Sequence, residues 1–464
     1  MIKRTLHFFK TGPDRPMIHD AGTVESFYES KRRRLFLWLI IGYGFFYTCR
    51  LSFSVSKKPM LEAGVLDVQQ MGVIGAVLLY VYAVGKFSNG FLSDRANIGR
   101  FMSIALLLSA VANLLFGLTS GFFLFIALWG INGWFQSIGS APSVVSLFQW
   151  FSKRERGSRY GLWAASHNLG EGVTFVGTAF IISALGWRWG FLAPGIVCVA
   201  VAIFMLRNLA DRPQTYGLPP VHEYKHDEPD PHSANGESVG QLQLLVLRNP
   251  LVWIIGLSSA LMYVTRYAVN GWAVLFMQES KGYTLVEAGS VMAAYPIVGI
   301  AGAISSGYLS DRLFKSNRIV PALIYGAFQT AGIALLWLTP PGQVWIDTLA
   351  LGLFGFGVGG SIVFLAGLIA VDMMPIRAAG AVKGIIGLFS YFGAATQYWI
   401  SGILIENTKF VVDGETSHDF GPAFSFWIFA SAASMVLILV VWMIGRRGSA
   451  AVASADRAEP SRSA

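Results

Sequence analysis

Residues 88–95 read SNGFLSDR and residues 305–312 read SSGYLSDR, so one motif occurs twice, 217 residues apart, in a chain of 464. A second pair keeps almost the same spacing, because Tyr47-Thr-Cys-Arg50 is matched by Tyr263-Val-Thr-Arg266 at an offset of 216. Two motifs repeated at one spacing indicate that the chain is built from two related halves.

The composition around these motifs is that of a membrane protein. Hydrophobic residues make up 54% of the chain and charged residues 13%, whereas a soluble domain carries about 25% charged residues. Cys49 and Cys198 both lie in apolar runs, so the sequence predicts neither a disulfide framework nor a metal site.

Apolar runs of about 20 residues are long enough to span a bilayer, and in lipid such runs must be helical. We expect spans near residues 35–56, 70–92, 101–120, 123–149, 158–184, 189–208, 250–279, 286–310, 319–338, 345–373, 378–407 and 421–446. The sequence therefore predicts an all-α membrane protein with twelve transmembrane helices in two six-helix halves.

The domain plan follows from these spans. We expect an N-terminal tail over 1–34, a first half over 35–208, a linker over 209–249, a second half over 250–447 and a disordered tail over 448–464. Of the 35 lysines and arginines, 26 fall on the side of the membrane that holds the N-terminus and 5 on the other. The positive-inside rule then places both termini and the linker in the cytoplasm. The net charge of +9 is thus a topology signal and does not indicate a nucleic-acid partner.

Each G-x-L-S-D-R motif follows the second helix of its half, and it resembles the loop signature of the major facilitator superfamily. We expect Gly90 and Gly307 to allow close helix contact there. The charged residues of the motif are expected to latch helix ends and to gate the protein rather than to bind its substrate. They are Asp94, Arg95, Asp311 and Arg312.

Several spans carry basic or titratable residues, although a charged side chain at mid-bilayer costs roughly 2.5–3.5 kcal/mol. These residues are Arg50, Lys86, His167, Arg266 and Lys383. Glu171 is the clear acidic counterpart, and Asp372 lies near a helix end. The interior is therefore cationic, which predicts a binding site for an anion.

Arg50 and Arg266 occupy matching positions in the first helix of each half, so the repeat brings them toward one central axis. A guanidinium group binds phosphate through two parallel hydrogen bonds, and two such groups facing one cavity would clamp one phosphoryl group. The alternative is a pair of structural salt bridges with Glu171 or Asp372.

Other residues of the same spans are candidate substrate contacts. His167 is a third phosphate contact, or a neutral histidine bonded to a backbone carbonyl. Lys86 contacts substrate or neutralises Glu171, and Lys383 contacts substrate or extends toward the membrane surface. Three tyrosines could bind phosphate oxygens or line a sugar pocket, with aromatic packing as the equal alternative: Tyr43, Tyr47 and Tyr263.

Longer stretches around these residues, among them FFYTCRLSF (45–53), WAASHNLG (163–170) and YVTRYAVNGW (263–272), resemble the organophosphate:inorganic phosphate antiporters of the major facilitator superfamily. That group includes transporters of glycerol-3-phosphate, hexose-6-phosphate and phosphoglycerate, and a membrane sensor of hexose phosphate. The resemblance implies that Arg50 and Arg266 bind phosphate with help from His167. It also implies a bacterial inner-membrane protein that works by alternating access.

The chain departs from the family pattern at several positions. Leu51 stands where a basic residue is usual, Glu171 interrupts a run of glycines, and Asn270-Gly271 replaces a common acidic residue. Phosphate binding survives these changes, but the identity of the organic part of the substrate stays open.

The leading functional hypothesis is an antiporter that exchanges hexose-6-phosphate, glycerol-3-phosphate or phosphoglycerate for inorganic phosphate. The alternative is a transporter-like sensor of external sugar phosphate that signals to a histidine kinase. An enzyme is not expected, because the sequence contains no metal-ligand cluster, nucleophile–base pair or nucleotide loop. We accordingly expect no cofactor, and a monomer, because one chain holds both halves.

Overall fold

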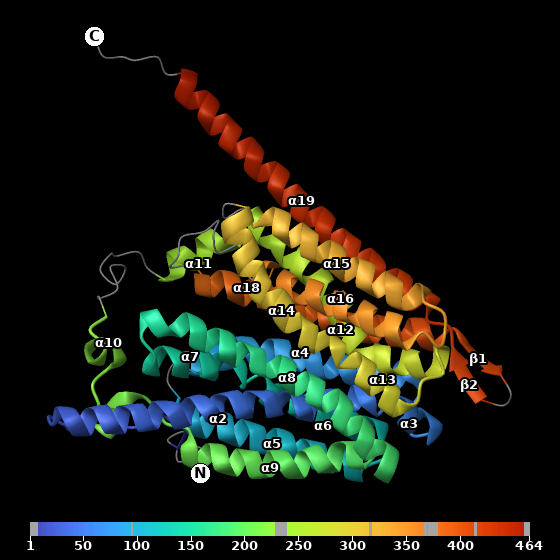
Figure 1. Cartoon of the computed structure of the whole chain (residues 1–464), viewed down its shortest axis with the longest axis horizontal. Coiled ribbons are helices and arrows are strands. Elements are labelled where there is room, and N and C mark those ends of the chain that lie inside the picture. The colour runs from blue at the N-terminus through green and yellow to red at the C-terminus, as the bar shows by residue number, and fades with distance from the viewer. Residues whose placement is uncertain are drawn as a thin grey trace.

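The structure is a computed structural model, and it describes residues 8–93, 96–227, 239–314, 318–365, 369, 379–412 and 415–458. It describes the backbone alone at 91, 153, 239–243, 311, 379–381, 412, 415 and 445–458. Two groups of long, roughly parallel helices lie side by side (Figure 1), the first blue to green and the second yellow to red. Most helices run along the same direction, which gives the bundle two ends. We call them the linker end, near α10 and α11, and the hairpin end, near α3 and the two strands.

The first half contains α2 Ala21–Val55, α3 Lys57–Glu62, α4 Val68–Ser93, α5 Ile98–Leu118, α6 Phe122–Gln136, α7 Ser140–Trp150, α8 Lys153–Leu185 and α9 Trp189–Asn208. The second half contains α12 Pro250–Ser280, α13 Leu285–Met292, α14 Ala294–Tyr308, α15 Ile319–Leu338, α16 Val344–Val363, α18 Ala379–Glu406 and α19 Gly421–Ala458. A π-helical turn, Leu309–Leu313, follows α14.

Within the described residues, eleven helical stretches are long and apolar enough to cross a membrane. They correspond to eleven of the twelve expected spans, so the chain is a multi-pass membrane protein. The remaining expected span coincides with α18, a helix of 28 residues that packs between α4 and α12. It carries Lys383 and three glycines in its first turns, which lowers the mean hydropathy of that part of the helix.

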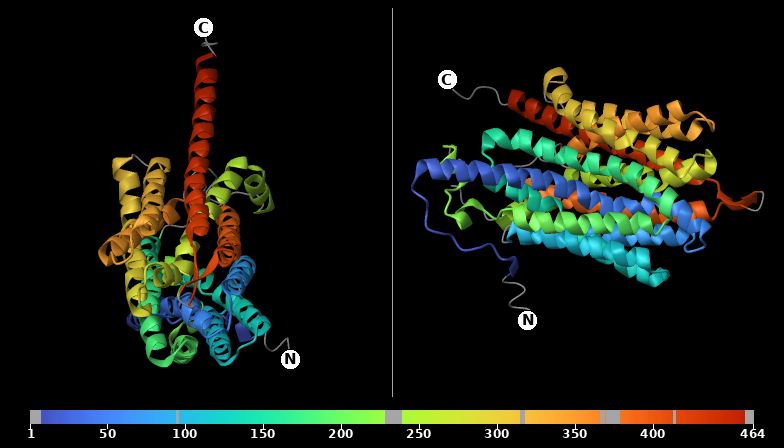
Figure 2. Two further views of the ribbon diagram at one scale, coloured as in Figure 1. Left: turned by 90° about the vertical axis from the view of Figure 1, so that its right-hand side faces the viewer. Right: turned by 60° about the horizontal axis from the view of Figure 1, so that its bottom comes forward.

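Short elements connect the long helices. The linker forms a 3-10 turn Pro213–Tyr216, α10 Val221–Tyr224 and α11 Val239–Arg248 around residues that the structure does not describe. Between α18 and α19, β1 Lys409–Val412 pairs antiparallel with β2 Glu415–His418. The helix α19 continues to Ala458 and extends past the bundle (Figure 2), so the unstructured tail expected from residue 448 is not what the structure has.

The two halves are in close contact toward the hairpin end. Tyr398 of α18 sits against glycines of both halves, because a Cβ at Gly75 of α4 would lie 2.6 Å from its Cε1 and one at Gly271 of α12 would lie 2.5 Å from its Cζ. Real Cβ atoms do not approach so closely, so only glycine admits the Tyr398 ring at these two positions. The space that the Tyr398 ring requires thus accounts for glycine at 271, one of the two positions where an acidic residue is common in the family.

A buried lysine lies in the same contact. Lys57 is fully buried, and its Nζ lies 3.0 Å from the ring centroid of Trp272 and 5.0 Å from that of Tyr398. Among the described residues its amine has no hydrogen-bond partner. Ring faces of the second half therefore cover the amine, and they attract its protonated form.

Hydrogen bonds also join the halves here. The carboxylate of Glu406, at the end of α18, accepts the backbone N–H of Val68 at the start of α4, at 3.1 Å. The Tyr80 and Thr396 hydroxyls are 2.8 Å apart. His418 lies between Glu279 and Glu406, at 2.9 and 3.6 Å, and ties the hairpin to α12 and α18. The hairpin end is thus closed by packing, charge and hydrogen bonds together.

Three glycines lie toward the linker end. A Cβ added at Gly90 of α4, Gly307 of α14 or Gly384 of α18 would meet no atom of the described residues within 4 Å. The expectation that Gly90 and Gly307 allow close helix contact is therefore wrong for this conformation.

Candidate anion-binding site

Arg50 lies on α2, five residues before its end, with 7% of its surface exposed. Its guanidinium carbon stands 4.1 Å from the ring centroid of Tyr47 and 5.4 Å from that of Tyr82. Its Nε and Nη1 atoms are buried and have no hydrogen-bond partner among the described residues. An unpaired buried guanidinium is costly, so the arrangement calls for an anion.

Arg266 occupies the corresponding place on α12 and is 5% exposed. Its Nε donates to the hydroxyl of Tyr295 at 3.2 Å, and its Nη2 lies 3.5 Å from Oε1 of Glu171. The expected alternative of a structural salt bridge with Glu171 is thus present at Arg266. Asp372, the other proposed partner, lies outside the described residues.

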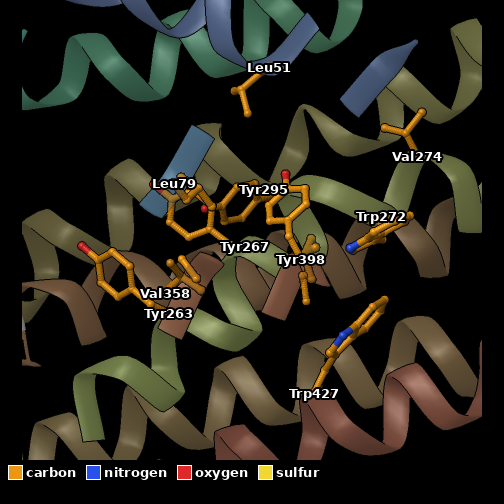
Figure 3. Packing of buried hydrophobic residues seen from close by; sticks show 14 of the residues in the cluster. Leu51, Leu79, Tyr263, Tyr267, Trp272, Val274, Tyr295, Val358, Tyr398 and Trp427 are labelled. Carbon is orange, nitrogen blue, oxygen red and sulfur yellow. The ribbon is translucent and has the colours of Figure 1, made fainter. Parts of the chain in front are cut away.

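Tyr267 connects the two arginines. Its ring centroid is 5.5 Å from the guanidinium carbon of Arg266, and its side chain lines one small cavity together with Arg50 and Tyr398. Figure 3 shows Tyr267, Tyr295 and Tyr398 among the buried residues of one core cluster. The two arginines that the repeat predicted to converge therefore belong to one buried cluster.

His167, on α8, joins this cluster from the first half. Its Nδ1–H donates to the backbone carbonyl of Ala164, and its ring lies 5.3 Å from the Tyr47 ring. Both arginines lie within electrostatic range of the imidazole. The hydrogen bond to the carbonyl fits the interpretation of His167 as a histidine bonded to the backbone. It also fixes the orientation of the ring, so that Nε2 is the nitrogen available to a ligand.

Two expected tyrosines pack on aromatic neighbours. The Tyr43 ring stacks on Trp163 at 4.5 Å, and the Tyr263 ring stacks on Tyr267 at 5.8 Å. Aromatic packing and ligand contact are compatible for a ring of this kind, because the hydroxyl group remains at its edge. Their role as substrate contacts stays a prediction.

Lys86, on α4, also reaches the cluster. Its Nζ stands 4.8 Å from the ring centroid of Tyr391, and it interacts electrostatically with both arginines. The ion pair of Glu171 is with Arg266, and none with Lys86 is present in the part of the chain that the structure describes.

Lys383 is not brought into the cluster. It is exposed on α18, eight residues before Tyr391, which is about 12 Å along a helix axis. Among the gating candidates, Asp94 and Arg95 lie outside the described residues, as does the side chain of Asp311. Arg312 is exposed and donates to the hydroxyl of Tyr308 in the preceding helical turn, at 3.3 Å.

Several members of the cluster were missed by the reasoning from sequence. These are Tyr82, Tyr267, Tyr295 and Tyr391, all buried. Tyr267 could have been found, because it follows Arg266 directly in a motif that was singled out. The others sit in apolar runs where a tyrosine gives no separate signal.

The cluster carries excess positive charge. Three basic side chains, those of Arg50, Lys86 and Arg266, meet one carboxylate, that of Glu171. With all four ionised, the excess is two positive charges. Within a low-dielectric interior such an excess attracts a small dianion strongly.

The helical fold and a charged site between two halves define a membrane transporter. The family model described as "Major Facilitator Superfamily" matches residues 32–397. This chain belongs to the Major Facilitator Superfamily. The expectation that it is not an enzyme is confirmed by that membership.

Similar proteins agree with this assignment. The chain is 34% identical to a "Probable hexose phosphate transport protein" of Chlamydia pneumoniae, over 83% of this chain and 88% of that protein. It is 34% identical to the "Membrane sensor protein UhpC" of Salmonella typhimurium, over 85% and 90%. It is 31% identical to the "Glycerol-3-phosphate transporter" of Bacillus subtilis, over 95% and 99%.

A solved structure supports the fold. A bacterial homologue of the human lysosomal transporter Spinster, in an inward-facing and unoccupied conformation, matches with a TM-score of 0.67 at 16% identity, over 89% of this chain and 95% of that chain.

Proposed function

We propose that this protein exchanges a phosphate monoester for inorganic phosphate across a bacterial inner membrane. The observation that carries the proposal is a pair of buried arginines in one cluster, one from the first helix of each half. In this cluster the Nε and Nη1 atoms of Arg50 have no hydrogen-bond partner among the described residues. Relatives named for hexose phosphate and glycerol-3-phosphate transport support a phosphate ester as the cargo.

Charge favours the same ligand. A phosphate monoester carries a charge of about −1.5 to −2 at pH 7, and inorganic phosphate ionises in a similar range. Either anion would offset the excess of two positive charges in the cluster. Because the arginines come from different halves, an anion bound by both draws the halves together. An empty cluster keeps its charge unbalanced, so a bound anion favours reorientation and hence exchange.

Orientation belongs to the same proposal. The distribution of lysine and arginine places the linker end in the cytoplasm, with both termini. The contacts between the halves at the hairpin end, Glu406 with the Val68 N–H and Lys57 with Trp272, support a conformation that is closed on the opposite side. One chain supplies both arginines, which supports a monomer as the working unit.

The test is exchange in proteoliposomes loaded with labelled phosphate, with glucose-6-phosphate, glycerol-3-phosphate or 3-phosphoglycerate added outside in turn. We expect efflux driven by at least one ester. Arg50→Lys and Arg266→Lys remove the two-pronged contact and should weaken phosphate binding by roughly tenfold to a hundredfold. Arg207→Lys, at an exposed position on α9, is the matched control.

A second candidate function is favoured by one observation, the 34% identity to a membrane sensor protein. In that case the chain would bind external sugar phosphate and signal to a histidine kinase. Folded protein that binds an ester but releases no labelled phosphate would support the sensor and contradict the exchanger.

A further inference from the structure

Next to the arginines is a polar pair that the phosphate clamp does not use. Glu171 of α8 and Asn270 of α12 are each 1% exposed. Both carboxylate oxygens of Glu171 and both amide atoms of Asn270 are buried without a hydrogen-bond partner among the described residues. The two side chains interact across the boundary between the halves.

Their position in the helices places this pair deeper than the clamp. Glu171 follows His167 by four residues and Asn270 follows Arg266 by four, so each lies one turn further toward the hairpin end on the same helix face. Because the pair lies one helical turn from His167 and Arg266, the organic part of a ligand whose phosphate group contacts these residues can reach Glu171 and Asn270.

The hydrogen-bonding capacity of Glu171 and Asn270 determines which ligand groups they can bind. An ionised carboxylate only accepts hydrogen bonds, and an amide both donates and accepts. Oε1 of Glu171 is in an ion pair with Arg266, but none of the four atoms has a hydrogen bond among the described residues. Because buried polar atoms are nearly always hydrogen-bonded, these atoms indicate a partner supplied by the ligand. Hydroxyl groups satisfy both residues, whereas a second carboxylate on the ligand would be repelled by Glu171.

We propose that Glu171 and Asn270 form a hydroxyl-reading subsite that selects phosphate esters of polyols over phosphate esters that also carry a carboxylate. This inference rests on the proposed function and narrows its substrate class. Glucose-6-phosphate and glycerol-3-phosphate are then accepted, and 3-phosphoglycerate is disfavoured. Glu171 acts here by charge as well as by hydrogen bonding. Removing its charge alone should therefore change the preference for glycerol-3-phosphate over 3-phosphoglycerate.

The experiment compares how each ester competes with labelled phosphate exchange in proteoliposomes. For every variant the half-maximal concentration of each ester is divided by that of unlabelled phosphate, which cancels any general loss of anion binding. Wild-type protein should prefer glycerol-3-phosphate to 3-phosphoglycerate. In Glu171→Gln we expect that preference to fall by about tenfold or more, because a hydrogen bond to a charged group is lost and the repulsion disappears.

Asn270→Asp provides an independent change, because a second carboxylate should strengthen the rejection of 3-phosphoglycerate. Glu223→Gln, the same chemical change at a linker side chain that is 55% exposed, is the matched control. Equal shifts for all three esters in Glu171→Gln, or an unchanged ratio, would overturn the subsite.

Failure of the exchanger proposal gives a different result. If wild-type protein binds esters but exchanges no phosphate, the same ratios are read from the ester-induced rise in Tm of the purified protein. If Glu171→Gln still lowers the preference for glycerol-3-phosphate over 3-phosphoglycerate, the result would support the subsite within a sensor. If Glu171→Gln leaves this preference unchanged, the result would overturn the subsite. Wild-type protein that no ester stabilises would overturn both proposals.

Discussion

The change Gly75→Ala tests how the hairpin end is closed. A methyl group at this position would overlap the ring of Tyr398, with Cε1 only 2.6 Å away. Overpacking of this kind costs about 1–3 kcal/mol. The cost falls only on the conformation in which the halves meet, so the ratio of closed to open hairpin ends should drop by roughly 5- to 150-fold.

The assay is the distance between spin labels on Glu62→Cys and Lys409→Cys, whose native side chains are 63% and 45% exposed on opposite halves. Both native cysteines are buried and compete little for the label. We expect Gly75→Ala to move the distance distribution toward longer values. Gly90→Ala, on the same helix with no atom of the described residues within 4 Å of the added methyl group, is the control for glycine replacement itself. An unchanged distribution in folded Gly75→Ala protein would refute the packing argument.

Three further changes test other contacts. Burial lowers the pKa of the Lys57 amine well below its ordinary value of 10.5. The conformation with a closed hairpin end therefore binds fewer protons than the one with an open hairpin end. Rising pH should favour the closed conformation between the lowered pKa and 10.5. Lys57→Met should abolish this pH dependence of the spin-label distance, and a dependence that persists would exclude Lys57 as its source. Glu406→Gln weakens the bond to the Val68 N–H, for which we expect a loss of closure of about tenfold, read from the same labels. Lys383→Ala should leave the apparent affinity for phosphate within about twofold in the exchange assay, because the side chain is exposed and lies outside the cluster; a tenfold loss would instead place Lys383 in the substrate path.

The membrane fold was predictable because length and apolarity determine which segments can cross a bilayer. Eleven expected spans coincide with helices that meet those two criteria. The expected span over 378–407 coincides with α18, and its contacts with α4 and α12 allow this helix to carry polar residues inside the bundle. The continuation of α19 to Ala458 could not be predicted, because that segment lacks the apolar pattern on which the spans were assigned.

The central site was predictable where a residue was out of place in its surroundings. Arg50 and Arg266 stood out as charges in apolar runs, and the structure brings both to one cluster. Tyr295 and Tyr391 gave no such signal, since an aromatic residue is ordinary inside a span. Closure at the hairpin end was not foreseen either, because it depends on small residues, such as Gly75 and Gly271, opposite one large ring.

The charge excess at the centre of the molecule also determines how the membrane potential acts on it. A dianion in the cluster leaves no net charge to move, so a loaded protein would change conformation almost independently of voltage. Without an anion, up to two charges would shift within the field, and a full crossing costs about 2.3 kcal/mol per charge per 100 mV. Glu171 reduces that number from three to two through its ion pair with Arg266. In the proposed exchange, one buried carboxylate would thus link substrate selection to the electrical behaviour of the transport cycle.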